Sequence, residues 1–187
     1  SSMTDYQDRA TCPLFGDAAA AVLVEPTEEN VGVVDGEFHV DGEGLSHLVM
    51  KAGGSVKPAS HETVDAREHY IYQEGRVVYK NAVRDMLSST QSVMKRNNLT
   101  VDDVDWLVPH QANLRIIEAV SSRIKIPEEK VLVNIQHYGN TSAASIPLCL
   151  DEFKNRLHKG DKIVMTAFGA GFTWGAMYLI WAFDPKN

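Results

Sequence analysis

Residues 104–116 read Val-Asp-Trp-Leu-Val-Pro-His-Gln-Ala-Asn-Leu-Arg-Ile. The segment 104–108 is short and apolar, which is typical of a buried strand. Residues 113–124 follow it and predict a helix. A polar link that carries His110 joins the two. The stretch therefore predicts a strand that ends at polar residues and leads into a covering helix.

The same alternation continues toward the C-terminus. Residues 131–133 predict a second buried strand, 141–157 a helix and 162–166 a third strand. Strands that alternate with helices indicate an α/β fold, with a mostly parallel sheet covered by helices. Residues 174–183 predict a last long strand. The connection 169–173 is too short for a crossover helix, so we expect the last two strands to form an antiparallel pair.

The region before residue 104 gives weaker signals. Residues 77–97 place apolar side chains at helical spacing and predict the clearest helix of the chain. Residues 18–24, Ala-Ala-Ala-Ala-Val-Leu-Val, favour a tightly packed strand because of their valines and the stop at Glu25-Pro26. Residues 31–40 predict a strand or a hairpin. From 41 to about 68 the pattern is weak and indicates a long surface connection.

Composition excludes several classes of protein. The net charge is -7 and the pI about 5.4, which argues against general nucleic-acid binding. No apolar run approaches the roughly 20 residues of a membrane-spanning helix. The first six residues show no signal-peptide pattern. Two cysteines, Cys12 and Cys149, make no disulfide framework and fit a reducing cytoplasm.

Polar or glycine-rich residues follow three of the predicted strands. They occupy 108–113, 137–142 and 167–171. Ligands of open α/β sheets bind outside the carboxyl ends of the strands, so we expect these three segments to meet at one edge.

Within these segments, His110 and Asn140 are candidates for chemistry. His110 can donate a hydrogen bond to a developing oxyanion or act as a base, and the alternative is a structural surface histidine. Asn140 carries an amide donor that does not titrate, and the alternative is a helix N-cap. Gly169 and Gly171 can aim a backbone N–H at a substrate oxygen or simply form a tight turn.

Neither cysteine has the surroundings of a nucleophile. Cys12 precedes Pro13 in an apolar lead-in, and Cys149 lies inside a helical run between leucines. Both are interpreted as small buried hydrophobic residues. The chain has no clustered Cys/His spacing for a metal and no third glycine for a dinucleotide site after Gly169 and Gly171.

Taken together, the motifs are more specific than any one of them. DWLVPHQANLRI at 105–116, HYGNTSAASIPLCLDE at 137–152 and AFGAGFTWG at 167–175 closely resemble the C-terminal half of β-ketoacyl-acyl-carrier-protein synthase III, a thiolase-fold condensing enzyme. DRATCPLFGDAAAAVLV at 8–24 and EGRVVYKNAV at 74–83 resemble family segments too. The resemblance covers nearly the whole chain.

The resemblance implies a thiolase-like fold, of which this chain is the C-terminal half with a five-stranded sheet. Residues 1–40 would be the last strand of the N-terminal half and the start of the connection, 41–72 the connecting loop region, and 73–187 the C-terminal domain. The nucleophilic cysteine of the family belongs to the other half, so we expect this chain to lack it.

The resemblance also implies roles for single residues. His110 and Asn140 match the catalytic histidine and asparagine, which would bind the thioester oxygen of a malonyl group as it loses CO₂. The Ala170 N–H matches an oxyanion-hole donor, although the family more often has glycine there. Phe168 matches a residue that lines the site, and Gly75 and Asn113 match positions near the coenzyme A arm.

The implied partners are acyl-CoA and acyl carrier protein. Lys80 and Arg115 match a basic surface that receives the carrier protein, and the alternative is a solvated helix face. The implied reaction joins acyl-CoA to malonyl-carrier protein and gives 3-oxoacyl-carrier protein in a cytoplasmic homodimer, without a cofactor of its own. The alternatives are a related secondary-metabolite ketosynthase with another starter or acceptor, and a non-catalytic fragment that acts only as a folded domain.

Overall fold

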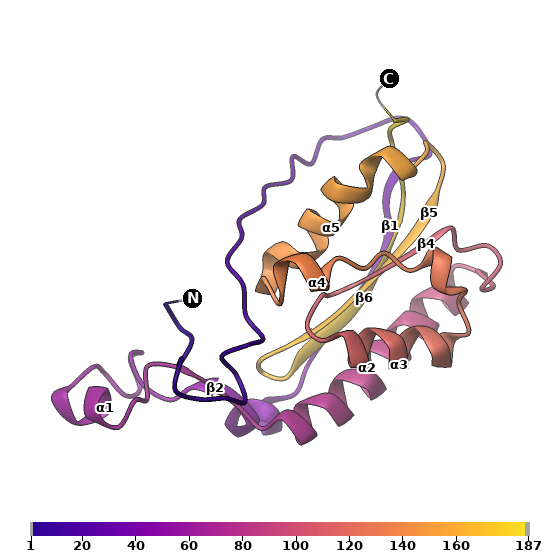
Figure 1. Cartoon of the computed structure of the whole chain (residues 1–187). Helices are drawn as coiled ribbons and strands as arrows, with labels where there is room; N and C mark the ends of the chain where they lie inside the picture. The colour runs from indigo at the N-terminus through magenta and orange to yellow at the C-terminus, as the bar shows by residue number, and fades with distance from the viewer. Residues whose placement is uncertain (1, 186–187) are drawn as a thin grey trace.

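The main sheet organises the chain. The computed structural model describes residues 2–185. The predicted ranges 1–40 and 73–187 also include residues 1, 186 and 187, which lie outside the described residues. The strands follow the order β1-β6-β5-β4, with helices on both faces (Figure 1). Their bounds are Gly32–Val40 for β1, Thr173–Ile180 for β6, Lys162–Gly169 for β5 and Trp106–Pro109 for β4.

The sheet is mixed, which corrects the prediction of a mostly parallel five-stranded sheet. Only β4 and β5 are parallel, whereas β5 pairs with β6, and β6 with β1, in antiparallel register. The expected fifth strand at 131–133 is reduced to a single bridge between Leu107 and Val131. The expected antiparallel pair β5–β6 is confirmed, but β1 covers its outer edge. Periodicity identifies a strand and does not reveal its neighbours.

Two hydrophobic clusters lie on opposite faces of the sheet, because successive side chains of a strand point to opposite sides. Leu107 and Val164 face α2 (Gly75–Arg96) and α3 (Leu114–Ile124). Val108 and Ile163 face α5 (Ser145–Phe153). The predicted helices at 77–97, 113–124 and 141–157 are thereby confirmed, the last as α5 with a 3-10 turn at each end. Pro147 stands in the first turn of α5, where no intrahelical N–H bond is lost.

Hydrogen bonds and ion pairs connect strand β1 to the C-terminal end of α2. The Arg96 guanidinium donates to Asp35 at 2.9 Å and to Glu37 at 2.6 Å. Ser92 Oγ donates to Glu37 at 2.5 Å, and Asn97 Nδ2 donates to Asp35 at 2.7 Å. Residues 32–40, which we grouped with the preceding half and the connection, therefore belong to the main sheet.

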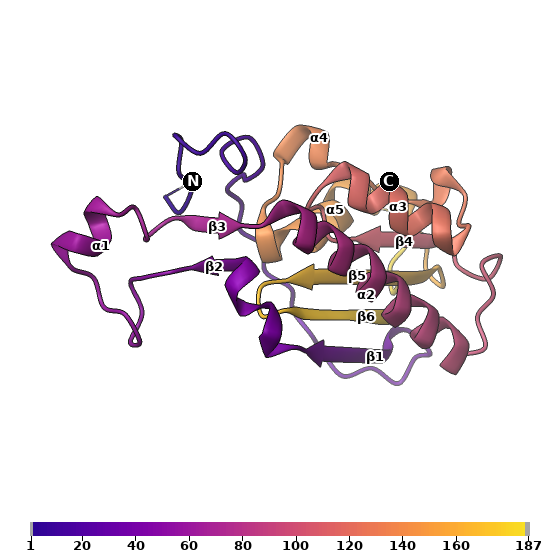
Figure 2. The same ribbon diagram turned by 90° about the horizontal axis from the view of Figure 1, so that it is seen from below.

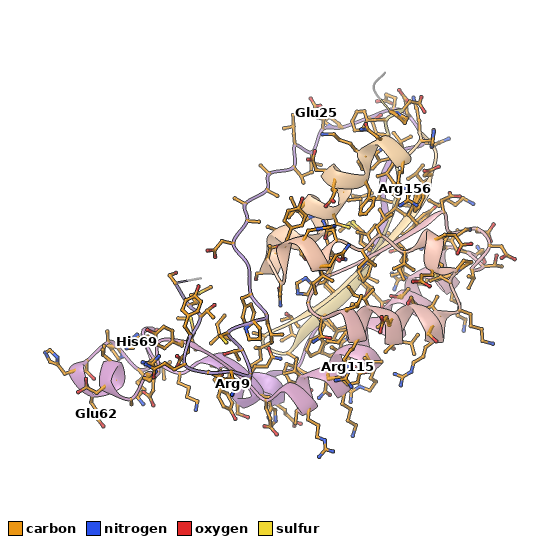
Figure 3. All side chains as sticks on the ribbon, in the orientation of Figure 1. Arg9, Glu25, Glu62, His69, Arg115 and Arg156 are labelled. Atoms are coloured by element: carbon orange, nitrogen blue, oxygen red, sulfur yellow. The ribbon has the colours of Figure 1, made fainter. Side chains whose placement is uncertain are left out.

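The prediction of a strand at 18–24 is wrong. These residues form an extended segment that pairs with no other part of residues 2–185. Glu25, labelled in Figure 3, follows directly after it. The side chains of Val22, Leu23 and Val24 are 70–83% exposed. An apolar run becomes a strand only where another strand accepts its hydrogen bonds.

The connection between β1 and α2 projects from the body as an arm (Figure 2). It contains a two-stranded ribbon, β2 (Leu48–Met50) with β3 (Ile71–Gln73), and the short helix α1 (His61–Asp65). The remaining short elements of the described chain are α4 (Ile135–Tyr138) and the 3-10 turns Gly42–His47, Glu128–Lys130, Ser142–Ala144 and Lys154–Arg156. In the described residues, no helix is both long and apolar enough to span a membrane.

Candidate active site

The three polar segments do meet at one edge of the sheet, as predicted. They border a cavity of about 750 Å³ that His110, Asn140, Phe168 and Ala170 all line. Gly75, Asn113 and Arg115 line it as well, from the N-terminal ends of α2 and α3. Lys80 is exposed on α2 and lies outside the lining. The structure therefore brings together every predicted site residue except Lys80.

His110 is held at the end of β4. Its backbone N–H donates to the carbonyl of Thr166 at 2.8 Å, which extends the β4–β5 ladder by one residue. Its ring is largely buried, and this burial lowers the pKa of His110 to about 4. The imidazole is therefore neutral at pH 7, with one ring nitrogen a donor and the other an acceptor. The Nδ1 atom lies 2.6 Å from Ser145 Oγ.

Gln111 supports the loop that presents His110. Its side chain is 1% exposed, and its Nε2 donates to the carbonyls of Pro109 at 2.7 Å and Leu132 at 3.2 Å. Its Oε1 accepts from the backbone N–H groups of Asn134 at 3.0 Å and Ile135 at 3.2 Å. One side chain thus joins the end of β4 to the segment that leads to Asn140. We did not identify it from the sequence, where the available signal was a glutamine between the predicted strand at 104–108 and the predicted helix at 113–124.

The Asn140 side chain is oriented by its own loop. Its Oδ1 accepts the backbone N–H of Ser142 at 2.9 Å, and because a backbone N–H can only donate, this contact defines which amide atom is the oxygen. The Nδ2 group has no hydrogen-bond partner among residues 2–185 and is left to donate toward the cavity. The oxygen acts as a turn acceptor, as in a helix cap, while the nitrogen stays available for a ligand.

The backbone of Asn140 is held by an early part of the chain. Its N–H donates to Leu14 at 2.8 Å, and its carbonyl accepts from Gly16 at 2.9 Å, which makes a parallel bridge at Phe15. The approach is close enough that a Cβ atom on Gly16 would lie 2.0 Å from the Tyr138 carbonyl oxygen. Glycine is therefore required at this position.

The turn between β5 and β6 forms another wall of the cavity that His110 and Asn140 line. Phe168, at the end of β5, is 7% exposed, and its ring lies 4.8 Å from the ring of Phe172. Ala170 is exposed in the turn, where its carbonyl accepts from Thr173 Oγ1 at 3.0 Å. Phe168 and His110 also line a second hollow of about 580 Å³, whose other lining side chains are mainly apolar, such as Ile146, Met165 and Trp174.

The mouth of the cavity is partly basic. Asn113 caps α3, because its Oδ1 accepts the N–H of Arg115 at 2.9 Å. Arg115, labelled in Figure 3, extends its guanidinium over the Tyr79 ring, 5.6 Å from the ring centre. Arg76 also lines the cavity. Arg76 and Arg115 are exposed and line the cavity, so their charges favour a negatively charged group there.

Neither cysteine faces His110. Cys149 is fully buried on the face of α5 that packs against the sheet, and burial raises the pKa of its thiol to about 12. Cys12 is half-buried and lines neither of the two hollows. Across residues 2–185, no group of three or more His, Cys, Asp or Glu side chains is arranged to hold a metal ion.

Comparison with known proteins identifies the relatives of this arrangement. Residues 94–181 match the model of the 3-oxoacyl-[acyl-carrier-protein] synthase III C-terminal domain, and residues 1–42 match the model of 3-oxoacyl-[acyl-carrier-protein] synthase III. The chain is 63% identical over all of its 187 residues to the β-ketoacyl-[acyl-carrier-protein] synthase III of Porphyromonas gingivalis. It spans 56% of the length of that relative.

Solved structures agree with the sequence relatives. The β-ketoacyl-[acyl-carrier-protein] synthase III of Thermus thermophilus is 39% identical, with a TM-score of 0.86 over 97% of this chain and 56% of that one. A priming β-ketosynthase of a polyketide biosynthetic pathway is 32% identical, with a TM-score of 0.83 over 98% and 55%. The predicted thiolase-like fold is confirmed. With the two family models matching well over half of the residues, the chain belongs to the 3-oxoacyl-[acyl-carrier-protein] synthase III family.

Proposed function

We propose that the complete protein catalyses a decarboxylative condensation of malonyl-acyl-carrier protein with acyl-CoA. The malonyl group loses CO₂, and the electron pair of the broken C–C bond forms an enolate. The enolate carbon attacks an acyl thioester, a new C–C bond forms, and a thiolate leaves. The product is 3-oxoacyl-carrier protein.

One observation carries this proposal: two uncharged donors, His110 and Asn140, line the same cavity. Decarboxylation develops negative charge on the thioester oxygen, and donors fixed in advance stabilise that charge more than they stabilise the substrate. The pKa of about 4 keeps His110 neutral at pH 7, so that it donates without transferring a proton. The Asn140 amide does not titrate.

We propose that the nucleophile comes from outside this chain. The Cys149 thiol is buried with a pKa of about 12, and Cys12 lines neither hollow. The apolar hollow beside His110 is a suitable place for a cysteine-bearing segment to approach. The Ala170 N–H would donate to the acyl thioester oxygen, and the 187-residue chain alone would be inactive in condensation.

The remaining assignments concern partners. Gly75, Asn113 and Phe168 would contact the arm of the thioester substrate, which a cavity of about 750 Å³ is large enough to admit. Arg115 at the mouth and Lys80 on the exposed face of α2 would receive an acidic carrier protein. We also propose that the complete protein is a cytoplasmic homodimer without a cofactor of its own.

A second candidate function keeps the site and changes the starter. It is supported by the similarity to the priming β-ketosynthase of a polyketide pathway, although the identity of 32% is lower than the 63% to the Porphyromonas gingivalis relative. A folded domain without activity is the third candidate, which direct assay distinguishes from both.

The test uses a hybrid, defined as the Porphyromonas gingivalis relative with its matching residues replaced by this chain. The hybrid should condense acetyl-CoA with malonyl-carrier protein, while the 187-residue chain alone should not. Assays with branched and longer acyl-CoAs then separate fatty-acid initiation from the second candidate. An inactive but folded hybrid, or condensation by the chain alone, would contradict the proposal.

A further inference from the structure

Ser145 stands behind His110 at the first position of α5. Its side chain is buried, with 2% of the residue exposed. Its Oγ lies 2.6 Å from His110 Nδ1 and 3.3 Å from the backbone nitrogen of Gln111. Its hydroxyl is thus shared between the ring of one residue and the backbone of the next.

The roles of these atoms follow from hydrogen-bond chemistry. The Gln111 N–H can only donate, so Ser145 Oγ accepts from it. The Ser145 hydroxyl carries one proton, and within residues 2–185 the acceptor at hydrogen-bond distance is His110 Nδ1. If Nδ1 carried a proton instead, the Ser145 O–H would be a buried donor without an acceptor, which costs free energy. The favoured arrangement therefore has Ser145 donating to a bare Nδ1.

We propose that Ser145 is a positioning residue that holds His110 in the tautomer with its proton on Nε2. This inference deepens the function proposed above for His110 and rests on it. With Nδ1 engaged, the Nε2–H is the donor directed toward the substrate, and His110 acts as an oxyanion donor. The opposite tautomer would present a lone pair and act as a base, without stabilising an enolate oxygen.

Ser145 can select a tautomer only if the His110 ring is neutral, since the imidazolium has protons on both nitrogens. Burial keeps the ring neutral at pH 7 by lowering the pKa of His110 to about 4. The Ser145 hydroxyl has a well-defined position because Ser145 lies in the first turn of α5. This helix is packed against the sheet, and its Cys149 is fully buried.

The direct test is ¹⁵N NMR of the histidine ring nitrogens in the 187-residue chain at pH 7. We expect His110 to show an unprotonated Nδ1 and a protonated Nε2. Ser145→Ala should give a mixture of tautomers, Ser145→Thr should restore the single tautomer, and Ser122→Ala, on the exposed side of α3, should change nothing. A protonated Nδ1 in the unmodified chain overturns the inference even if Ser145→Ala does not fold, and so does a tautomer that Ser145→Ala leaves unchanged.

Kinetics of the hybrid provide the second readout. Ser145→Ala should lower kcat by roughly ten-fold with little change in KM, less than the roughly 100- to 1,000-fold expected for losing the donor itself. Ser145→Thr should recover most of the rate. If NMR shows the tautomer to depend on Ser145 while His110→Ala condenses normally, the proposed function fails and the tautomer assignment stands. If His110→Ala is inactive and Ser145→Ala is fully active, this inference fails and the function stands.

Discussion

The backbone N–H of Gly16 donates a 2.9 Å hydrogen bond to the carbonyl oxygen of Asn140. A segment near the start of the chain thereby holds a candidate catalytic residue that follows α4. The two backbones approach so closely that the position of Asn140 depends on the absence of a side chain at residue 16.

Gly16→Ala should therefore destabilise the chain and displace Asn140. The added Cβ would lie 2.0 Å from the Tyr138 carbonyl oxygen, and a backbone contact of that kind must open. We expect a loss of roughly 1–3 kcal/mol in the free energy of unfolding, measured by urea titration. Gly54→Ala, where the Cβ meets nothing within 4 Å, is the matched control and should stay within about 0.5 kcal/mol. Equal effects of the two substitutions would show that the contact is unimportant.

Gln111→Leu should be among the more damaging single changes. It removes a side chain whose four hydrogen bonds satisfy Pro109, Leu132, Asn134 and Ile135, and it leaves those backbone groups buried without partners. We expect a cost of roughly 2–4 kcal/mol in the free energy of unfolding. Gln91→Leu, on the exposed side of α2, should be nearly neutral under the same denaturation. A loss below 1 kcal/mol for Gln111→Leu would contradict the bridging role.

Stability should depend on pH through His110. Its pKa falls from 6.5 to about 4 on folding, so the unfolded chain binds a proton more readily than the folded one. The free energy of unfolding should therefore be highest above pH 6.5, decrease as the pH falls toward 4 and level off below it. The His110 contribution amounts to roughly 3 kcal/mol. Urea titrations of the chain and of His110→Gln between pH 7 and 4 measure it as their difference. Parallel curves would refute it.

Cys149 should be inert in the folded chain. With a thiol pKa of about 12 and no exposure, it stays protonated and inaccessible at pH 8. Iodoacetamide followed by peptide mass spectrometry should modify Cys12 well before Cys149, and both should react after denaturation in urea. Rapid modification of Cys149 in the native chain would remove the argument that the nucleophile comes from elsewhere.

The sequence predicted the parts of the fold that depend on local pattern. The helix at 77–97, the strand before His110 and the short β5–β6 connection all carry their own periodicity or length limits, and all three are present. The convergence of His110 and Asn140 was also predicted, on the rule that strand ends meet at one edge. The strand expected before Asn140 is only a single bridge, and residues 14–16 hold Asn140 in place instead.

What failed depends on partners distant in the sequence. Residues 18–24 have the composition of a strand and no strand to pair with among residues 2–185. The pairing of β1 with β6 depends on long-range register that no local pattern encodes. Ser145 and Gln111 were missed because a serine at the start of a helix and a glutamine after a strand are common in structural roles. Only their distances to His110 and its loop reveal a supporting task.

The most direct test of the central claim is the rate at which the hybrid decarboxylates malonyl-carrier protein in the absence of an acyl donor. His110→Ala and Asn140→Ala should each lower this rate by roughly 100- to 1,000-fold, and the double variant should lose little more than either alone, because the two donors act on one oxygen. Decarboxylation at the unmodified rate in both folded single variants would contradict the claim that these residues hold the enolate oxygen.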